Sequence, residues 1–282
     1  MCCLVRNPAV VDGSCNILAR TLTVSLSQVG IFMSKISTSK QVIKLVGKAI
    51  GDFSLVQDND RILVALSGGK DSWSLLYSLL ALKKRAPINY EIQAVVIAPE
   101  PNTEYLGKMA SRLNSDGIPY KFIYCDISSI VTKHLTNGTN PCSFCSRIRR
   151  GILYSFASGE GWNKIALGHH LDDFVETLLL NLFYNGSIKG MSPKLAADDG
   201  KNIIIRPLVY VREENTARMA EEMGLPVVDC GCIFQRAVDS KRLWVKELLT
   251  NLEKEAPNIK NSILSSMSRV YNRHLLNFVT KN

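Results

Sequence analysis

The chain has 282 residues, 46% of them hydrophobic and 21% charged, which is the composition of a globular protein and excludes a chain that is disordered throughout. At roughly 100–200 residues per domain, the length allows one large domain or two small ones. Lys and Arg outnumber Asp and Glu by 34 to 25, and every apolar run is far shorter than the roughly 18 residues of a bilayer span, so we expect no membrane partner.

The first 32 residues show no helical or strand period, are rich in Ser and hold one acidic residue. Such a segment fits a targeting stretch, a poorly ordered tail, or a spurious extension upstream of a true start at Met33. We favour the last of these. The expected folded domain then covers residues 33–232, and a basic helical extension covers residues 233–282.

From residue 41 onward, short apolar strands alternate with helical segments. The continuous apolar run at 62–66 predicts a strand buried on both faces. Helical spacing predicts helices at 42–50, 71–84, 103–116, 146–160 and 172–184, and apolar runs predict strands at 92–98, 121–125, 164–168 and 203–206. Strands separated by helices of this length indicate right-handed crossovers, so the predicted fold class is α/β with a parallel, doubly wound sheet.

The chain beyond residue 212 is predicted to be mostly helical. A short strand is expected at 226–228, and a last helix is expected to begin near Ile259. Four leucines predict an apolar stripe on the helix before Pro257, namely Leu243, Leu248, Leu249 and Leu252. Residues 241–282 hold eight basic and three acidic side chains, whereas residues 41–240 are close to neutral, so the tail suits a polyanionic partner.

A glycine-rich loop follows the first predicted strand and opens directly into a helix; its residues are Ser67, Gly68, Gly69, Lys70, Asp71 and Ser72. The glycines let the backbone approach a phosphate, the helix offers unpaired amides, and Lys70 adds a charge. Asp71 either caps the helix or holds Mg²⁺ beside the phosphates. The pattern predicts an anion site, with a capped turn as the alternative, and it differs from both Walker A and GxGxxG loops.

The string SGGKDS resembles the PP-loop of the ATP pyrophosphatases. This resemblance implies an adenine nucleotide alpha hydrolase-like fold that uses ATP and Mg²⁺ to adenylate a carbonyl oxygen. Amide-forming ligases, lysidine synthesis on tRNA and tRNA thiolation all remain open on this motif alone.

Polar residues also follow the predicted strand at 164–168. His169, His170, Asp172 and Asp173 lie where that strand ends and a helix begins, so we expect at least one carboxylate to face the nucleotide. Together with Gly168, Asp172 and Asp173 are candidate ATP-binding residues. Helix capping is the alternative for each carboxylate.

Eight cysteines are too few for a small disulfide scaffold, and with no convincing secretory signal they indicate a reducing, cytoplasmic setting. Cys142 and Cys145 form a CxxC at a predicted helix start, where the helix dipole favours thiolate. Cys230 and Cys232 form a second group. Three thiolates on an iron–sulfur cluster would leave one iron open, four would suit a closed zinc site, and a metal-free dithiol is the third alternative.

Longer stretches resemble the tRNA 2-thiocytidine synthetases: PCSFCSRIRRGILY at 141–154, IALGHHLDD at 165–173, LFY at 182–184, KGM at 189–191 and IRPL at 205–208. The resemblance implies that a [4Fe-4S] cluster on three cysteines serves ATP-dependent replacement of the C2 oxygen of cytidine 32 in the tRNA anticodon loop, through an adenylated base and cluster-bound sulfur. Cys142 and Cys145 match two ligands, and we expect Cys230 to be the third. The family usually has CxxC at that last position, so the Cys-Gly-Cys of this chain leaves Cys232 open.

Three basic residues lie beside the CxxC, within the acid-free stretch 127–159. Arg147, Arg149 and Arg150 are candidate contacts to tRNA phosphates, and a solvated helix face is the alternative. A cysteine desulfurase as sulfur donor and a homodimer complete the expected partners. Two rival functions remain: a lysidine synthetase-like enzyme would not need three cysteines, and a non-catalytic metal-containing RNA-binding protein would not need the PP-loop.

Overall fold

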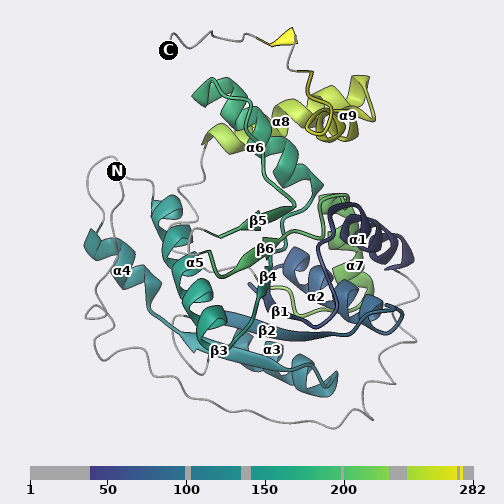
Figure 1. Cartoon of the computed structure of the whole chain (residues 1–282). Coiled ribbons are helices and arrows are strands. Elements are labelled where there is room, and N and C mark those ends of the chain that lie inside the picture. The colour runs from purple at the N-terminus through teal and green to yellow at the C-terminus, as the bar shows by residue number, and fades with distance from the viewer. Residues whose placement is uncertain are drawn as a thin grey trace, which may run out of the picture.

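The computed structural model in Figure 1 describes residues 39–98, 103–134, 141–197, 200–228, 240–271 and 274–275, without the side chain of Cys142. The predictions for residues 1–32, and those for Cys230 and Cys232, lie outside the described residues. No helix in the described part of the chain is both long and apolar enough to cross a membrane.

The strands form one mixed sheet, in the order β3-β2-β1-β4-β6-β5. Their bounds are β1 (Asp60–Ala65), β2 (Tyr90–Ala98), β3 (Tyr120–Tyr124), β4 (Lys164–Ala166), β5 (Lys194–Ala196) and β6 (Ile203–Ile205). The first five strands in this order are parallel, which confirms the predicted sheet. The edge strand β5 runs antiparallel to β6 and was not predicted, because three residues are too few to show a period.

The helices of the described chain are α1 (Lys40–Phe53), α2 (Lys70–Lys83), α3 (Glu104–Ser115), α4 (Ile127–His134), α5 (Pro141–Gly159), α6 (Leu171–Asn185), α7 (Glu213–Glu222), α8 (Ser240–Glu255) and α9 (Ile259–Ser266). They cover both faces of the sheet. Ile62 and Val64 of β1 pack into the core beneath α1, α2, α3 and α7, whereas Leu63 packs into a second core beneath α5. Alternate residues of a strand point to opposite faces, so the fully apolar run at β1 reflects burial on both sides.

The C-terminal helices α8 and α9 pack on α6, above the sheet in Figure 1. Val245 and Leu249 of α8 are buried against Leu171, Val175 and Leu179 of α6. The predicted stripe of four leucines is therefore wrong in part. Its two end members stay exposed, by 50% for Leu243 and 40% for Leu252, because the buried face of α8 is centred on Val245 and Leu249.

The order of the strands creates a crevice between β1 and β4. From β1 the chain moves to β2 and β3 on one side, then returns to β4 on the other side of β1. The carboxyl ends of neighbouring parallel strands flank a crevice where such a reversal occurs, and ligands of doubly wound sheets bind there. The glycine-rich loop follows β1 and residues 167–170 follow β4, so the topology brings both predicted nucleotide-binding segments to this crevice.

Candidate active site

The glycine-rich loop is shaped by hydrogen bonds between its two serines. The Ser72 hydroxyl accepts from the Ser67 amide at 3.2 Å and donates to the Gly69 carbonyl at 2.9 Å. The Ser67 hydroxyl lies 3.1 Å from that of Ser72 and accepts from the Gly69 amide at 3.3 Å. Helix α2 begins at Lys70 directly after Gly69, so its free amides open onto the crevice.

Two glycines are required here by close approach of other segments. Gly68 has a φ of +89°, and a Cβ at this position would lie 2.4 Å from Cγ2 of Val228. At the end of β4, a Cβ on Gly168 would lie 3.0 Å from the Ser72 amide nitrogen. The loop is thus packed between the segment that follows β4 and the segment that leads to Cys230.

The segment before Cys230 is attached to the phosphate loop by its backbone. The Val228 amide donates to the Gly68 carbonyl at 3.0 Å, and the Pro226 carbonyl accepts from the Trp73 indole at 3.2 Å. The predicted strand at 226–228 is wrong, because these residues hydrogen-bond a loop and a side chain and join no strand of the sheet. Val228 is two residues before Cys230 in the sequence.

Lys70 carries the positive charge of the loop. Its Nζ lies 3.1 Å from Glu213 Oε1 and 3.4 Å from Asp71 Oδ2. Partial burial lowers the pKa of Lys70, but the carboxylates of Asp71 and Glu213 outweigh this effect and raise the pKa above its ordinary value. Lys70 is therefore fully protonated at neutral pH.

Asp71 has neighbours from two further segments, α7 and the residues that precede α6. Its carboxylate is hydrogen-bonded by the buried Thr216 hydroxyl of α7, and His170 Nε2 lies 3.9 Å from its Oδ2. Asp71 therefore does not act as the N-cap of α2, a position that Gly69 occupies. The capping alternative is wrong for this residue, and a contact of its carboxylate with Mg²⁺ stays a prediction.

The buried His170 ring lies 3.5 Å from the carboxylates of both the buried Asp172 and the partly exposed Asp173. Asp173 caps α6 by accepting from the His170 amide at 3.0 Å, and Asp172 accepts from the Glu213 amide at 2.8 Å. Burial lowers the pKa of His170, but the carboxylates of Asp172, Asp173 and Asp71 outweigh burial and raise it. The helix-capping alternative is thus confirmed for Asp173, and an ATP contact by either aspartate stays a prediction.

The C-terminal extension contributes three cations to this group. Lys260 pairs with Asp172 at 2.8 Å, Lys246 pairs with Glu213 at 2.7 Å, and Arg242 lies 3.3 Å from Asp173. Burial raises the pKa of Asp172, but His170, Lys260 and the Glu213 amide together lower it far below the ordinary range. Sequence reasoning missed these residues; the only trace was the excess of basic side chains after residue 240.

His169 faces a different partner. Arg206 Nε donates to His169 Nδ1 at 3.3 Å, and Arg206 Nη1 donates to the Ser192 carbonyl at 2.6 Å. Burial, reinforced by Arg206 and Arg242 against the opposing Asp173, lowers the pKa of His169 to about 4. A neutral imidazole is what the hydrogen bond requires, since Nδ1 must be unprotonated to accept from Arg206.

The CxxC lies in the first turns of α5. This helix begins at Pro141, five residues before the predicted start at 146. Cys145 is a free, half-buried cysteine in the first turns of this helix. Further along the same helix, Arg147 and Arg150 are exposed and Arg149 is half-buried. None of these three arginines forms an ion pair with a carboxylate among the described residues. Cationic side chains without carboxylate partners are available to phosphates, and cysteine thiolates are suitable ligands for iron.

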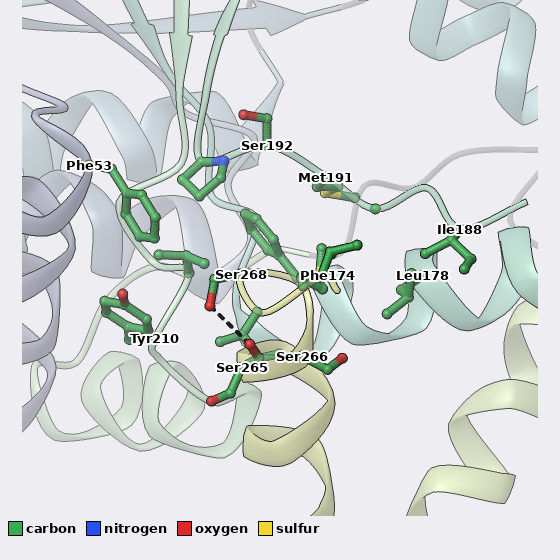
Figure 2. Close-up of a pocket in the computed structure, with 16 residues that line it drawn as sticks. Phe53, Phe174, Leu178, Ile188, Met191, Ser192, Tyr210, Ser265, Ser266 and Ser268 are labelled. Carbon is green, nitrogen blue, oxygen red and sulfur yellow. Dashed lines mark hydrogen bonds between the residues drawn. The ribbon is translucent and has the colours of Figure 1, made fainter. Parts of the chain in front are cut away.

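One apolar pocket of the described chain lies away from the phosphate loop. Figure 2 shows it between Phe53 and Tyr210 on one side and Leu178 and Ile188 on the other, with three serines of the segment 265–268 at its base. Its volume is about 540 Å³. No charged side chain lines it, so this pocket is unsuited to a triphosphate.

Comparisons with known proteins agree with this arrangement. The PP-loop domain family matches residues 37–229. The tRNA-cytidine(32) 2-sulfurtransferase of Syntrophotalea carbinolica is 47% identical over 237 residues, which cover 84% of this chain and 92% of that protein. The protein of the same name from Geobacter sulfurreducens is 45% identical over 241 residues, with the same two coverages.

One solved structure is similar at the level of the whole fold. It is the U34-tRNA thiolase NcsA from Methanococcus maripaludis with its [4Fe-4S] cluster, which matches with a TM-score of 0.67 at 27% sequence identity. The match covers 84% of this chain and 80% of the thiolase.

Proposed function

This chain belongs to the tRNA-cytidine(32) 2-sulfurtransferase family of PP-loop proteins, and from that premise we propose that it converts cytidine 32 of a tRNA anticodon loop to 2-thiocytidine with ATP. One observation supports this function above the others. The Val228 amide donates to the Gly68 carbonyl, which holds the chain leading to Cys230 against the phosphate loop. A single cytidine can then react with ATP at the phosphate loop and receive sulfur from a neighbouring site.

The phosphate loop activates the base in the proposed reaction. The C2 oxygen of cytidine attacks the α-phosphorus of ATP, pyrophosphate leaves, and the adenylated oxygen becomes a good leaving group. Lys70 would exchange Glu213 and Asp71 for phosphate oxygens, and the amides at the start of α2 would neutralise further charge. Sulfur then forms a bond to C2 and AMP departs with the oxygen.

The cysteines are proposed to hold the [4Fe-4S] cluster. Cys142, Cys145 and Cys230 would be its ligands, and the cluster would supply an open iron position that holds sulfur near C2. The free, half-buried Cys145 in the first turns of α5 has the chemistry that this role requires. Arg147, Arg149 and Arg150 on the same helix would bind tRNA phosphates.

Finer elements complete the proposal. Mg²⁺ would bind between the ATP phosphates and Asp71, since Mg²⁺ is usually held by one or two carboxylates together with phosphate oxygens. A cysteine desulfurase would supply the sulfur. The enzyme would act in the reducing cytoplasm as a homodimer.

The test is nucleoside analysis by mass spectrometry after reaction of the anaerobically purified protein with unmodified tRNA, ATP and sulfide. We expect 2-thiocytidine to form only with ATP, and a tRNA with uridine at position 32 to gain none. Iron in the protein argues against a lysidine synthetase, and tRNA-dependent pyrophosphate release argues against a non-catalytic RNA-binding protein. A protein that forms lysidine when free lysine is added, or that releases no pyrophosphate with tRNA, would overturn the proposal.

A further inference from the structure

Three aromatic side chains gather on the surface where α6 ends and α8 begins. Phe183, Tyr184 and Trp244 are 47%, 42% and 48% exposed. The Trp244 ring lies edge-to-face with both others, with ring centroids 5.8 Å from Phe183 and 6.3 Å from Tyr184. We call Phe183, Tyr184 and Trp244 the aromatic platform; none of its members contributes to the site around the phosphate loop.

The platform carries positive charge. Lys241 Nζ lies 4.6 Å from the centre of the Tyr184 ring, over its face. Of the other cations at the start of α8, Arg242 pairs with Glu176 and Asp173 and Lys246 pairs with Glu213, so Lys241 is the cation that lies on the platform itself. Aromatic rings interleaved with cations are the combination that binds single-stranded nucleic acid, through base stacking and phosphate contacts.

The position of the platform relates it to the nucleotide site. Helix α6 begins at the buried aspartates beside the phosphate loop and ends at the platform. Tyr184 lies eleven positions after Asp173, a rise of about 17 Å along the helix. An RNA whose target base enters the crevice therefore has neighbouring nucleotides within reach of the platform.

We propose that the aromatic platform is a base-stacking surface for an unpaired nucleotide of the tRNA, a proposal that rests on the proposed function. A second copy of the chain is the competing occupant, because Leu182 and Leu243 are also exposed. Lys241 favours RNA: an ammonium group on the ring face complements phosphate, whereas burial in an apolar interface would desolvate it.

The experiment uses the fact that Trp244 is the exposed tryptophan of this chain. Trp73 is fully buried and Trp162 is 8% exposed, so iodide quenching of tryptophan fluorescence reports mainly on Trp244. Unmodified tRNA should protect the wild-type protein from iodide. Trp244→Ala should weaken tRNA binding about 5- to 150-fold, the range found for loss of one stacked base, and Trp244→Phe should retain most of the affinity.

Salt dependence separates stacking from charge. Trp244→Ala should leave the slope of log affinity against log salt unchanged, whereas Lys241→Gln should reduce that slope by about 0.7. Leu252→Ala is the matched control, since Leu252 is an exposed apolar residue two turns further along α8 and should bind tRNA as the wild type does.

The outcomes separate this proposal from the proposed function. Unchanged tRNA affinity in Trp244→Ala, with thiolation intact, overturns the platform alone. If the wild-type protein forms no 2-thiocytidine but Trp244→Ala still weakens its binding of tRNA, the proposed reaction alone is overturned. If light scattering shows that Trp244→Ala dissociates a dimer while tRNA affinity per protomer is unchanged, the surface joins two copies of the chain and the proposal is wrong.

Discussion

Lys260 of α9 and Asp172 at the start of α6 form an almost fully buried ion pair, with Lys260 Nζ 2.8 Å from Asp172 Oδ1. The lysine side chain is 14% exposed and the aspartate 7%. Because Asp172 also accepts from the Glu213 amide at the start of α7, this pair connects the C-terminal extension to two helices that border the crevice. The extension is thus a structural part of the nucleotide site. Some of its basic side chains form ion pairs with acidic side chains of α6 and α7.

Lys260→Met should lower the free energy of unfolding by about 3 kcal/mol, because removal of one partner leaves a buried charge uncompensated. The double variant Lys260→Met with Asp172→Asn should lose less free energy of unfolding than Lys260→Met alone, because it removes both charges of the pair. Urea unfolding measures both. Lys254→Met, which removes an exposed lysine of α8, is the control; equal losses from Lys254→Met and Lys260→Met would contradict the role of the buried pair.

His170 should make the stability depend on pH above 6.5, the ordinary pKa of a histidine. Its folded-state pKa is raised above the ordinary 6.5, so its contribution is complete below pH 6.5 and is lost as the pH rises through the folded pKa. The loss is at most about 1.4 kcal/mol per pH unit. His169, with a pKa of about 4, stays neutral throughout this range.

Thermal unfolding of the wild type and of His170→Asn between pH 6 and 8.5 checks this expectation. The difference in stability between the two proteins should shrink as the pH rises. His134→Gln, at an exposed histidine of α4, should follow the wild type in parallel. A difference that stays constant or grows with pH would show that His170 is not charged in the folded protein.

Gly68→Ala should weaken ATP binding and destabilise the protein by more than 1 kcal/mol. The new methyl group would collide with Val228, and a non-glycine residue at a φ of +89° is itself strained. Adding Val228→Ala should restore only part of the loss, because the backbone strain remains. Gly69→Ala is the matched control: its φ is −73° and a Cβ there meets only the Ser67 hydroxyl at 3.5 Å. Isothermal titration with ATP would contradict the argument if the two alanine variants bound equally.

Lys70→Ala and Asp71→Ala should each reduce kcat/KM for thiolation by at least about 100-fold while the iron content stays at the wild-type level. One site handles phosphate and the other handles sulfur, so the two readouts should separate. Lys48→Ala, which removes an exposed lysine of α1, should keep full activity. Wild-type turnover in either loop variant would remove the phosphate loop from the mechanism.

Cys230→Ser should abolish both the cluster and thiolation, whereas Cys232→Ser should keep substantial iron and activity. The hydrogen bond from the Val228 amide to the Gly68 carbonyl holds the chain two residues before Cys230, and a turn at Gly231 would carry Cys232 away. Iron and sulfide analysis of the two anaerobically purified variants decides between them. The opposite pattern would assign the third thiolate to Cys232.

Much of the site was predictable because it is local in sequence. The loop from Ser67 to Ser72 lies between a predicted strand of five residues and a predicted helix of fourteen residues, and both have a clear pattern in the sequence. The elements that were missed or misplaced are short or lack a period: β5, α4, the first turn of α5 and the segment 226–228. Their conformations depend on contacts with distant parts of the chain, which local spacing does not record.

The alternation of strands and helices follows from local patterns in the sequence, and the parallel sheet and the position of the phosphate loop follow from that alternation. The partners of the charged groups depend instead on how distant elements pack. Lys70 with Glu213, Asp71 with Thr216 and Asp172 with Lys260 are separated by 88 to 145 residues along the chain. Burial patterns repeat along a single element and can be read locally, but an ion pair depends on where two separate elements meet, and only the packed fold fixes that meeting.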